Sequence, residues 1–327
     1  MQFSDMLKIT KDRNLKWAEY AVKGSVLFLV AIFLGHEIIS EKGFEAFDSN
    51  LIGQIGQVIP IIVVMCILNW CLEAAKWHVL ANSVTNLSYA ESLKGVFSGL
   101  ALSRIVPGGI GECFGRMGYL NTSHRVEAGA LVYLGGAIQF FITVIFGSYG
   151  VAHFAKAKFT IMPFVAILIA LALIATIFLF IFFKIDFGLG SRFSRGFFRI
   201  KSALQLLTFT TFVKFTFLGI LRYLVFGLQL YLLFHTMNLG IQPHLIIAGI
   251  TLIYLTKTII PTFNFLGDLG IRELSAIYFF SQFSVHSNLV VLPTLVLWLI
   301  NILLPSLLGL YFIARARIFS LQPEIVK

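Results

Sequence analysis

Residues 161–183 read IMPFVAILIALALIATIFLFIFF, a stretch without a charged side chain that is apolar on every helical face. A helix of this length crosses a hydrocarbon core about 30 Å thick. A transmembrane β-strand would need only about ten residues, alternately polar and apolar. Because a helix satisfies its backbone hydrogen bonds internally, the stretch predicts a membrane-spanning α-helix.

The composition extends this prediction to the whole chain. Of its 327 residues, 58% are hydrophobic and only 12% are charged, whereas about a quarter of the residues in a soluble domain are charged. The apolar windows predict six transmembrane helices, near residues 18–39, 57–80, 127–150, 161–184, 210–235 and 288–313. We therefore expect an all-α polytopic membrane protein in which residues 1–327 form a single integral membrane domain.

Two further apolar stretches, 92–120 and 244–282, are interrupted by proline and glycine. Each interruption contains a cation, a proline, several glycines, an acidic residue and an arginine. The first contains Arg104, Pro107, Gly108, Gly109, Gly111, Glu112 and Arg116, and the second contains Lys257, Pro261, Gly267, Asp268, Gly270, Arg272 and Glu273. This shared order predicts an internal repeat offset by about 154 residues, with halves 15–150 and 158–315.

The orientation of the halves follows from the number of crossings and from the positive charges. Segments 8–23 and 184–201 each hold five Lys and Arg residues, which indicates that both are cytoplasmic, as is the basic C-terminus. Only Lys156 and Lys158 oppose this assignment. If the interruptions are re-entrant hairpins, the six transmembrane helices and two Pro/Gly-broken hairpins form an inverted repeat in the inner (plasma) membrane. If the interruptions instead cross fully, there are eight crossings and the halves are parallel.

The interruptions are also the predicted binding site. A helix that breaks inside the membrane leaves backbone N–H groups unpaired at the positive end of its dipole, which suits an anion. The predicted substrate-binding residues are Arg104, Pro107, Gly108, Gly109, Gly111, Arg116, Lys257, Pro261, Gly267, Gly270 and Arg272. Residues predicted to balance their charge, or to take up a proton, are Glu73, Glu112, Asp268 and Glu273. Alternatively, Glu112 and Arg116 only neutralise each other on one helical face.

Other polar residues within the apolar helices allow two interpretations. Glu73 and Lys76 either face the bundle interior or form an interfacial pair flanked by tryptophans. Arg222 either joins the site or extends to the cytoplasmic face. Gln139 and Gln229 are predicted to make helix-packing hydrogen bonds.

Several function classes are excluded by missing motifs. The sequence has no phosphate-binding loop, no HExxH, no GxSxG and no paired-cysteine motif, so we expect neither an enzyme nor a cofactor or metal site. Its formal net charge of +10 fits basic loops against anionic lipid, and nucleic acid is not an expected partner.

Three motifs in order resemble the transmembrane domain of lysylphosphatidylglycerol synthases and related stand-alone flippase-like proteins. They are Asn69-Trp70-x-x-Glu73-x-x-Lys76-Trp77, Pro107-Gly108-Gly109-Ile110-Gly111-Glu112-x-x-x-Arg116, and Pro261 with Gly267-Asp268-Leu269-Gly270-Ile271-Arg272-Glu273. The resemblance covers about residues 15–315 and implies lipid translocation between leaflets. Archaeal relatives are associated with lipid-linked glycan export. No acyltransferase-like domain follows the membrane part, so aminoacyl transfer is not expected.

The leading functional hypothesis is a lipid translocase, flippase or scramblase-like, that moves an anionic phospholipid or a polyprenyl-phosphate-linked lipid between leaflets without ATP. One alternative is a secondary transporter of a small anion. Another is a non-transporting membrane partner of an envelope-synthesis enzyme. An enzyme that modifies a lipid is the weakest alternative, because no nucleophile or metal set is present.

Overall fold

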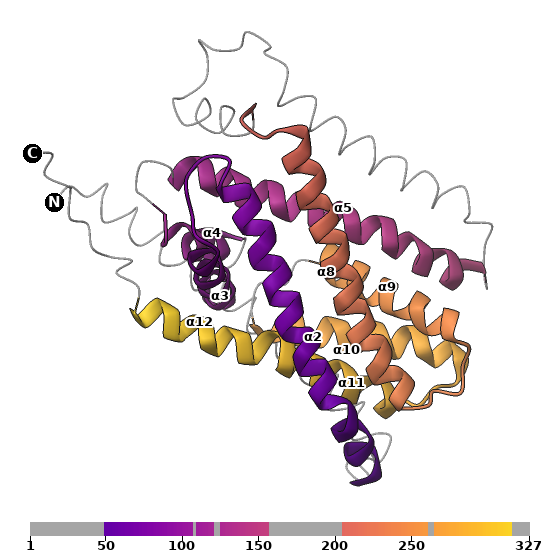
Figure 1. Cartoon of the computed structure of the whole chain (residues 1–327). Coiled ribbons are helices and arrows are strands. Elements are labelled where there is room, and N and C mark those ends of the chain that lie inside the picture. The colour runs from indigo at the N-terminus through magenta and orange to yellow at the C-terminus, as the bar shows by residue number, and fades with distance from the viewer. Residues whose placement is uncertain (1–48, 107–108, 121–124, 157–204, 261–264, 316–327) are drawn as a thin grey trace, which may run out of the picture.

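The computed structural model describes residues 49–106, 109–120, 125–156, 205–260 and 265–315, all in helices and short connections (Figure 1). The predicted helices near 18–39 and 161–184 lie outside these ranges. So do three of the predicted site residues, Pro107, Gly108 and Pro261.

Within the described ranges, four segments are long and apolar enough to span a bilayer. They agree with four of the predicted crossings and cover Leu51–Ala81, Glu127–Phe154, Phe209–Thr236 and Asn288–Ile313. The helices that contain them are α2 (Ser49–Ala81), α5 (Arg125–Lys156), α8 (Phe209–Thr236), and α11 (Asn288–Trp298) with α12 (Leu304–Arg315). Between α11 and α12, Leu299–Leu303 forms a π-helical turn.

Both interrupted stretches are broken helices, as predicted. The first consists of α3 (Tyr89–Ile105) and α4 (Ile110–Met117), and the second of α9 (Pro243–Ile259) and α10 (Phe265–Phe280), after which a 3₁₀ turn covers Ser281–Phe283. The first helix of each pair, α3 or α9, ends with the same backbone geometry. Val106 and Ile260 have extended backbone, and their N–H groups donate to the carbonyls of Leu102 and Thr256. The two positions are 154 residues apart, which is the offset predicted for the repeat.

The first broken stretch begins with a capped helix, α3, and α4 then packs closely against it. Ser88 caps α3 in a capping box with Glu91, whose pKa is held below its ordinary value by hydrogen bonds from the Ser88 hydroxyl and backbone N–H. A Cβ on Gly115 would collide with the backbone of Gly99. Because the glycines have no side chain there, α4 folds back directly onto α3.

The helices of the two halves pack reciprocally. In the centre, α2 lies along α8 (Figure 1). The last helix of the first half, α5, packs on α9, while α12 from the second half packs on α3. Both contacts bring a glycine against a backbone carbonyl, Gly150 against Ala248 and Gly309 against Phe97. Each broken helix is therefore covered by a helix from the other predicted half of the chain.

Candidate functional site

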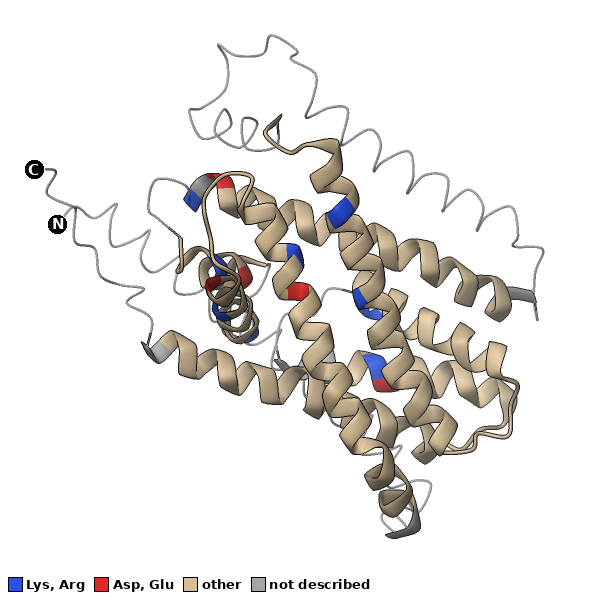
Figure 2. Ribbon diagram, viewed as in Figure 1, with Lys and Arg blue, Asp and Glu red and all other residues tan. Residues whose placement is uncertain are grey.

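A cavity of about 390 Å³ lies where the two halves meet, lined by α2, α3, α4, α5, α8 and α9. Figure 2 shows long uncharged stretches of helix, with charged residues concentrated in the central part of the bundle. Among the described residues, the charged side chains that line this central cavity are Lys76, Arg104, Arg116, Arg222, Lys257, Glu73 and Glu112. Five cations thus face two carboxylates, so the cavity wall has an excess of positive charge.

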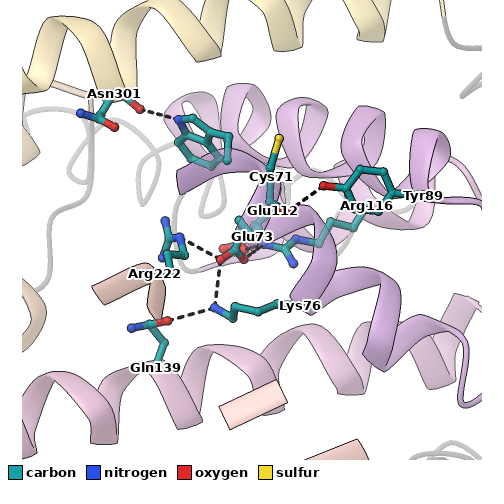
Figure 3. A network of polar contacts seen from close by, with 10 residues as sticks. Cys71, Glu73, Lys76, Tyr89, Glu112, Arg116, Gln139, Arg222 and Asn301 are labelled. Carbon is teal, nitrogen blue, oxygen red and sulfur yellow. Dashed lines mark hydrogen bonds and ion pairs between the residues drawn. The ribbon is translucent and has the colours of Figure 1, made fainter. Parts of the chain in front are cut away.

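Glu73 of α2 is the centre of this charge cluster (Figure 3). Its Oε1 accepts a hydrogen bond from Arg116 Nη2 at 2.7 Å, while its Oε2 lies 2.9 Å from Lys76 Nζ and 3.0 Å from Arg222 Nε. Glu73 is only 7% exposed. One buried carboxylate therefore joins α2, α4 and α8, and the Glu73–Lys76 pair lies inside the bundle, where Glu73 also pairs with Arg116.

Glu112 supplies the second carboxylate. It pairs with Arg116 one helical turn away, and its side chain is 41% exposed. The two residues share one helical face, as predicted. Since Arg116 also reaches Glu73 on another helix, the Glu112–Arg116 pair is part of the cluster and does more than neutralise itself.

The two buried glutamines differ in their roles. Gln229 Nε2 donates to the carbonyl of Ile62 at 2.9 Å, which confirms the predicted packing contact between α8 and α2. Gln139 of α5 instead accepts a hydrogen bond from Lys76 Nζ at 2.9 Å and lines the central cavity. This hydrogen bond joins α5 to α2, as the predicted packing role requires, and it also places the Gln139 amide against the charge cluster.

Aromatic rings flank the three cations around Glu73. Lys76 Nζ lies 5.2 Å from the centroid of the Phe215 ring, Arg116 Cζ 5.4 Å from that of Trp77, and Arg222 Cζ 5.6 Å from that of Trp70. A cation over an aromatic face is attracted by the ring quadrupole, more strongly where water is excluded. These rings hold the cations in place without neutralising them.

The π-helical turn Leu299–Leu303 is attached to the site through α2. Trp70 Nε1 donates to the Asn301 carbonyl at 3.1 Å, and the Cys66 thiol donates to the Ile300 carbonyl at 3.3 Å. The Trp70 ring that flanks Arg222 is thus fixed from both halves of the chain.

The second break contributes less to the central cavity. Lys257 of α9 lines it, whereas Arg272 and Glu273 of α10 are not among its lining residues and are only 1% and 0% exposed. Arg272 Cζ lies 5.7 Å from the centroid of the Phe226 ring. The structure thus brings Arg104, Arg116 and Lys257 to one cavity but not Arg272. Three other predicted residues of this half, Gly267, Asp268 and Gly270, lie on α10.

The described glycines of the first break have structural roles. Gly109, the N-cap of α4, has a φ of 74°, a left-handed conformation that glycine adopts most easily. A Cβ on Gly111 would collide with the backbone of Leu102. Gly111 therefore permits helix packing, whereas Gly109 reverses the chain beside a second hollow.

That hollow is a groove of about 330 Å³ between α4 and α5. Glu112, Val132, Gly136 and Phe140 line both the groove and the central cavity. The other three residues that line the groove, Gly109, Tyr133 and Ala137, do not line the central cavity. The two spaces are adjacent, and one is rich in charge whereas the other is mainly apolar.

Sequence reasoning left the cluster incomplete. Lys76 and Arg222 were considered but not assigned to the site, and Gln139 was assigned to packing. The available signal was an ionisable or amide side chain inside a long apolar helix. Within the described ranges, no three His, Cys, Asp or Glu side chains lie close enough together to hold a metal ion.

Comparison with known proteins adds the family. No curated protein and no solved structure matches the chain significantly. The sequence model of the lysylphosphatidylglycerol synthase TM region matches residues 20–309, which includes both broken helices and every residue of the charge cluster. A membrane domain associated with lipid handling agrees with apolar helices around a cationic cavity. The chain belongs to the family of the lysylphosphatidylglycerol synthase transmembrane region.

Proposed function

We propose that this protein is a lipid translocase that passes the headgroup of an anionic lipid through the central cavity. The substrate is an anionic phospholipid or a polyprenyl-phosphate-linked lipid. The observation that carries the proposal is that five cations of the described residues line one cavity enclosed by apolar helices.

The depth of the charge cluster supports this function. Arg222 and Gln139 lie near the middle of the apolar spans Phe209–Thr236 and Glu127–Phe154. Ionisable side chains at such a depth are costly and mark substrate or ion pathways by default.

The residues divide into two groups by their contacts. Glu73 holds Lys76, Arg116 and Arg222 in fixed positions through its three ion pairs. Arg104 and Lys257 line the same cavity from α3 and α9. A phosphate between Arg104 and Lys257 would form charge-assisted hydrogen bonds and reduce the surplus positive charge.

We propose transport without chemical conversion of the lipid and without ATP. The same cavity would also suit a secondary transporter of a small anion, and an envelope-synthesis enzyme is a candidate partner that supplies or consumes the lipid. The two transport functions differ in whether the bound anion carries a hydrocarbon chain, so a lipid assay separates them.

The test is translocation in proteoliposomes of short-chain fluorescent phosphatidylglycerol, with phosphatidylcholine as the neutral comparison. The protein is expected to move the anionic lipid selectively. Arg104→Gln with Lys257→Gln should slow this by about tenfold or more, because two charge-assisted contacts are lost.

The matched control is Lys94→Gln with Lys214→Gln, which removes the same charge from exposed positions outside the central cavity. Equal effects of the two double variants would contradict a role for the cavity. Movement of neither lipid by the unaltered protein would contradict the translocase itself.

We also propose that the halves are inverted, with both termini cytoplasmic in the inner membrane. The reciprocal packing of α5 on α9 and α12 on α3 supports a two-fold relation between the halves. Accessibility tags near residues 123 and 282 should then lie on opposite sides of the membrane. Tags on one side would favour fully crossing breaks and parallel halves.

A further inference from the structure

We propose that the groove between α4 and α5 is a lateral portal that holds a hydrocarbon chain of the lipid while its headgroup lies in the central cavity. This inference rests on the proposed function and adds the path of the part of the lipid that never enters the charge cluster.

The first argument is that the two spaces are adjacent. Four residues line both of them, namely Glu112, Val132, Gly136 and Phe140. The charges are divided unequally. The five cations named above line the central cavity, and none of them lines the groove. Among the described residues, Glu112 is the one charged residue in the groove wall. An anion is favoured on one side of this boundary and an apolar chain on the other.

The outer wall of the groove is the second argument. Tyr133 is 52% exposed and Phe140 is 39% exposed, and the neighbouring Phe114 of α4 is 58% exposed. On apolar helices in a bilayer, such side chains contact lipid. The groove therefore connects the lipid-facing surface of α4 and α5 with the interior of the bundle.

Gly136 is the third argument, because it lies at the boundary and is open. A Cβ on Gly136 would meet no heavy atom within 4 Å. By contrast, a Cβ on the adjacent Gly135 would lie 3.3 Å from the Phe215 ring and 3.5 Å from Leu80. Gly135 is explained by helix packing, whereas Gly136 leaves space where the cavity and the groove meet.

The described part of the second half is closed at the matching position. The residue one repeat offset after Gly136 is Val290 of α11, which is 0% exposed. The first half therefore has a glycine at this position, whereas the second half has a buried valine side chain. The open boundary is thus a property of α4 and α5 and not a necessary result of the repeat.

The experiment fills the portal without changing charge. Gly136→Trp places a large side chain in open space, and Gly53→Trp on α2, where a Cβ also meets nothing within 4 Å, is the matched control. Translocation of fluorescent phosphatidylglycerol is measured for both in proteoliposomes. Binding of glycerol phosphate, which has no chain, is measured by thermal shift in detergent.

The expected result is that Gly136→Trp slows translocation by about tenfold or more but leaves glycerol phosphate binding within about twofold, while Gly53→Trp changes neither. Unchanged translocation by folded Gly136→Trp would overturn the portal and leave the translocase intact. Loss of glycerol phosphate binding as well would also overturn it, since the position would then belong to the headgroup site. Failure of the unaltered protein to move or bind any lipid would overturn both proposals.

A second experiment does not depend on the folding of Gly136→Trp. A benzophenone amino acid at Ala137, within the groove, is compared with one at Val64 of α2, which is 63% exposed. Ala137 is expected to cross-link phosphatidylglycerol in preference to phosphatidylcholine in mixed vesicles, and Val64 to show no preference. Equal preference at the two positions would overturn the portal.

Discussion

The first helices of the two broken pairs end in the same backbone conformation, but the helices that follow them differ. After Val106, α4 returns along α3 and presents Arg116 to the central cavity. After Ile260, α10 carries Arg272 and Glu273 into positions that are almost completely buried. A similar sequence order therefore gives one set of charges that lines the central cavity and one set that is buried outside it. The difference teaches that packing around a break decides whether its charges can reach a ligand.

The largest effect should come from changing Glu73 of α2, whose carboxylate pairs with Arg116 of the first broken helix and with Arg222 of α8. Glu73→Gln leaves Lys76, Arg116 and Arg222 without their common counter-ion, which should destabilise the protein by about 3–5 kcal/mol. Thermal and denaturant unfolding in detergent would measure the loss.

The control for this prediction is Glu73→Gln combined with Arg116→Gln, which should recover part of the stability because one unbalanced cation is removed with the carboxylate. A Glu73→Gln protein as stable as the original would show that the cluster does not hold the two halves together.

The next largest effect is expected when the close packing at a glycine of each broken stretch is disturbed. Gly115→Ala forces a Cβ into the backbone of Gly99, whereas Gly249→Ala meets the side chains of Phe279 and Phe280. We expect overpacking costs of about 3 kcal/mol and 1 kcal/mol, because aromatic rings can rotate and a helix backbone cannot. Unfolding midpoints of the two variants would test the order, and the reverse order would show that α4 is free to shift.

A smaller effect is expected on phosphate binding, which should depend on Lys257 in the central cavity and not on the exposed Lys214. Inorganic phosphate is expected to raise the unfolding temperature of the protein by binding its folded state. Lys257→Gln should weaken this binding by about tenfold, the loss of one charge-assisted contact, while Lys214→Gln leaves it unchanged. Identical phosphate titrations of the two variants would remove α9 from the site.

The smallest effect should come from the cap that starts the first broken stretch. Ser88→Ala removes the capping box of α3 and should cost about 1 kcal/mol at neutral pH. The folded-state pKa of Glu91 is lowered, so its contribution is present above the unfolded pKa and is lost as the pH falls through the folded pKa. The difference in unfolding temperature should therefore shrink on acidification, and a constant difference would show that the Glu91 carboxylate takes no part.

Much of the fold could be predicted because the required information is local. A long apolar run, such as Leu51–Ala81, has to form a helix wherever it lies in the bilayer. Proline and glycine break a helix regardless of its neighbours, so both interruptions appear where the sequence places them. Glu73, Arg104, Arg116 and Lys257 were assigned to the site for the same reason, since charge in an apolar segment is visible without a structure.

The remaining parts of the site depend on how the helices are rotated against one another. Gln139 joins Lys76 only because α5 turns that face inward, and Arg222 meets Glu73 from a helix in the other half of the chain. Residue type alone predicted similar roles for Arg116 and Arg272, although only Arg116 lines the central cavity.

The sequence by itself determined the membrane class, four spans that the structure repeats, the two breaks and the family, because hydropathy and helix breaking act within a segment. Only the tertiary structure decided which carboxylate pairs with three cations, which arginine faces the central cavity, and that Gly136 lies where this cavity adjoins the groove. Those features depend on distances of a few ångströms between residues far apart in the chain, and these distances are set by packing.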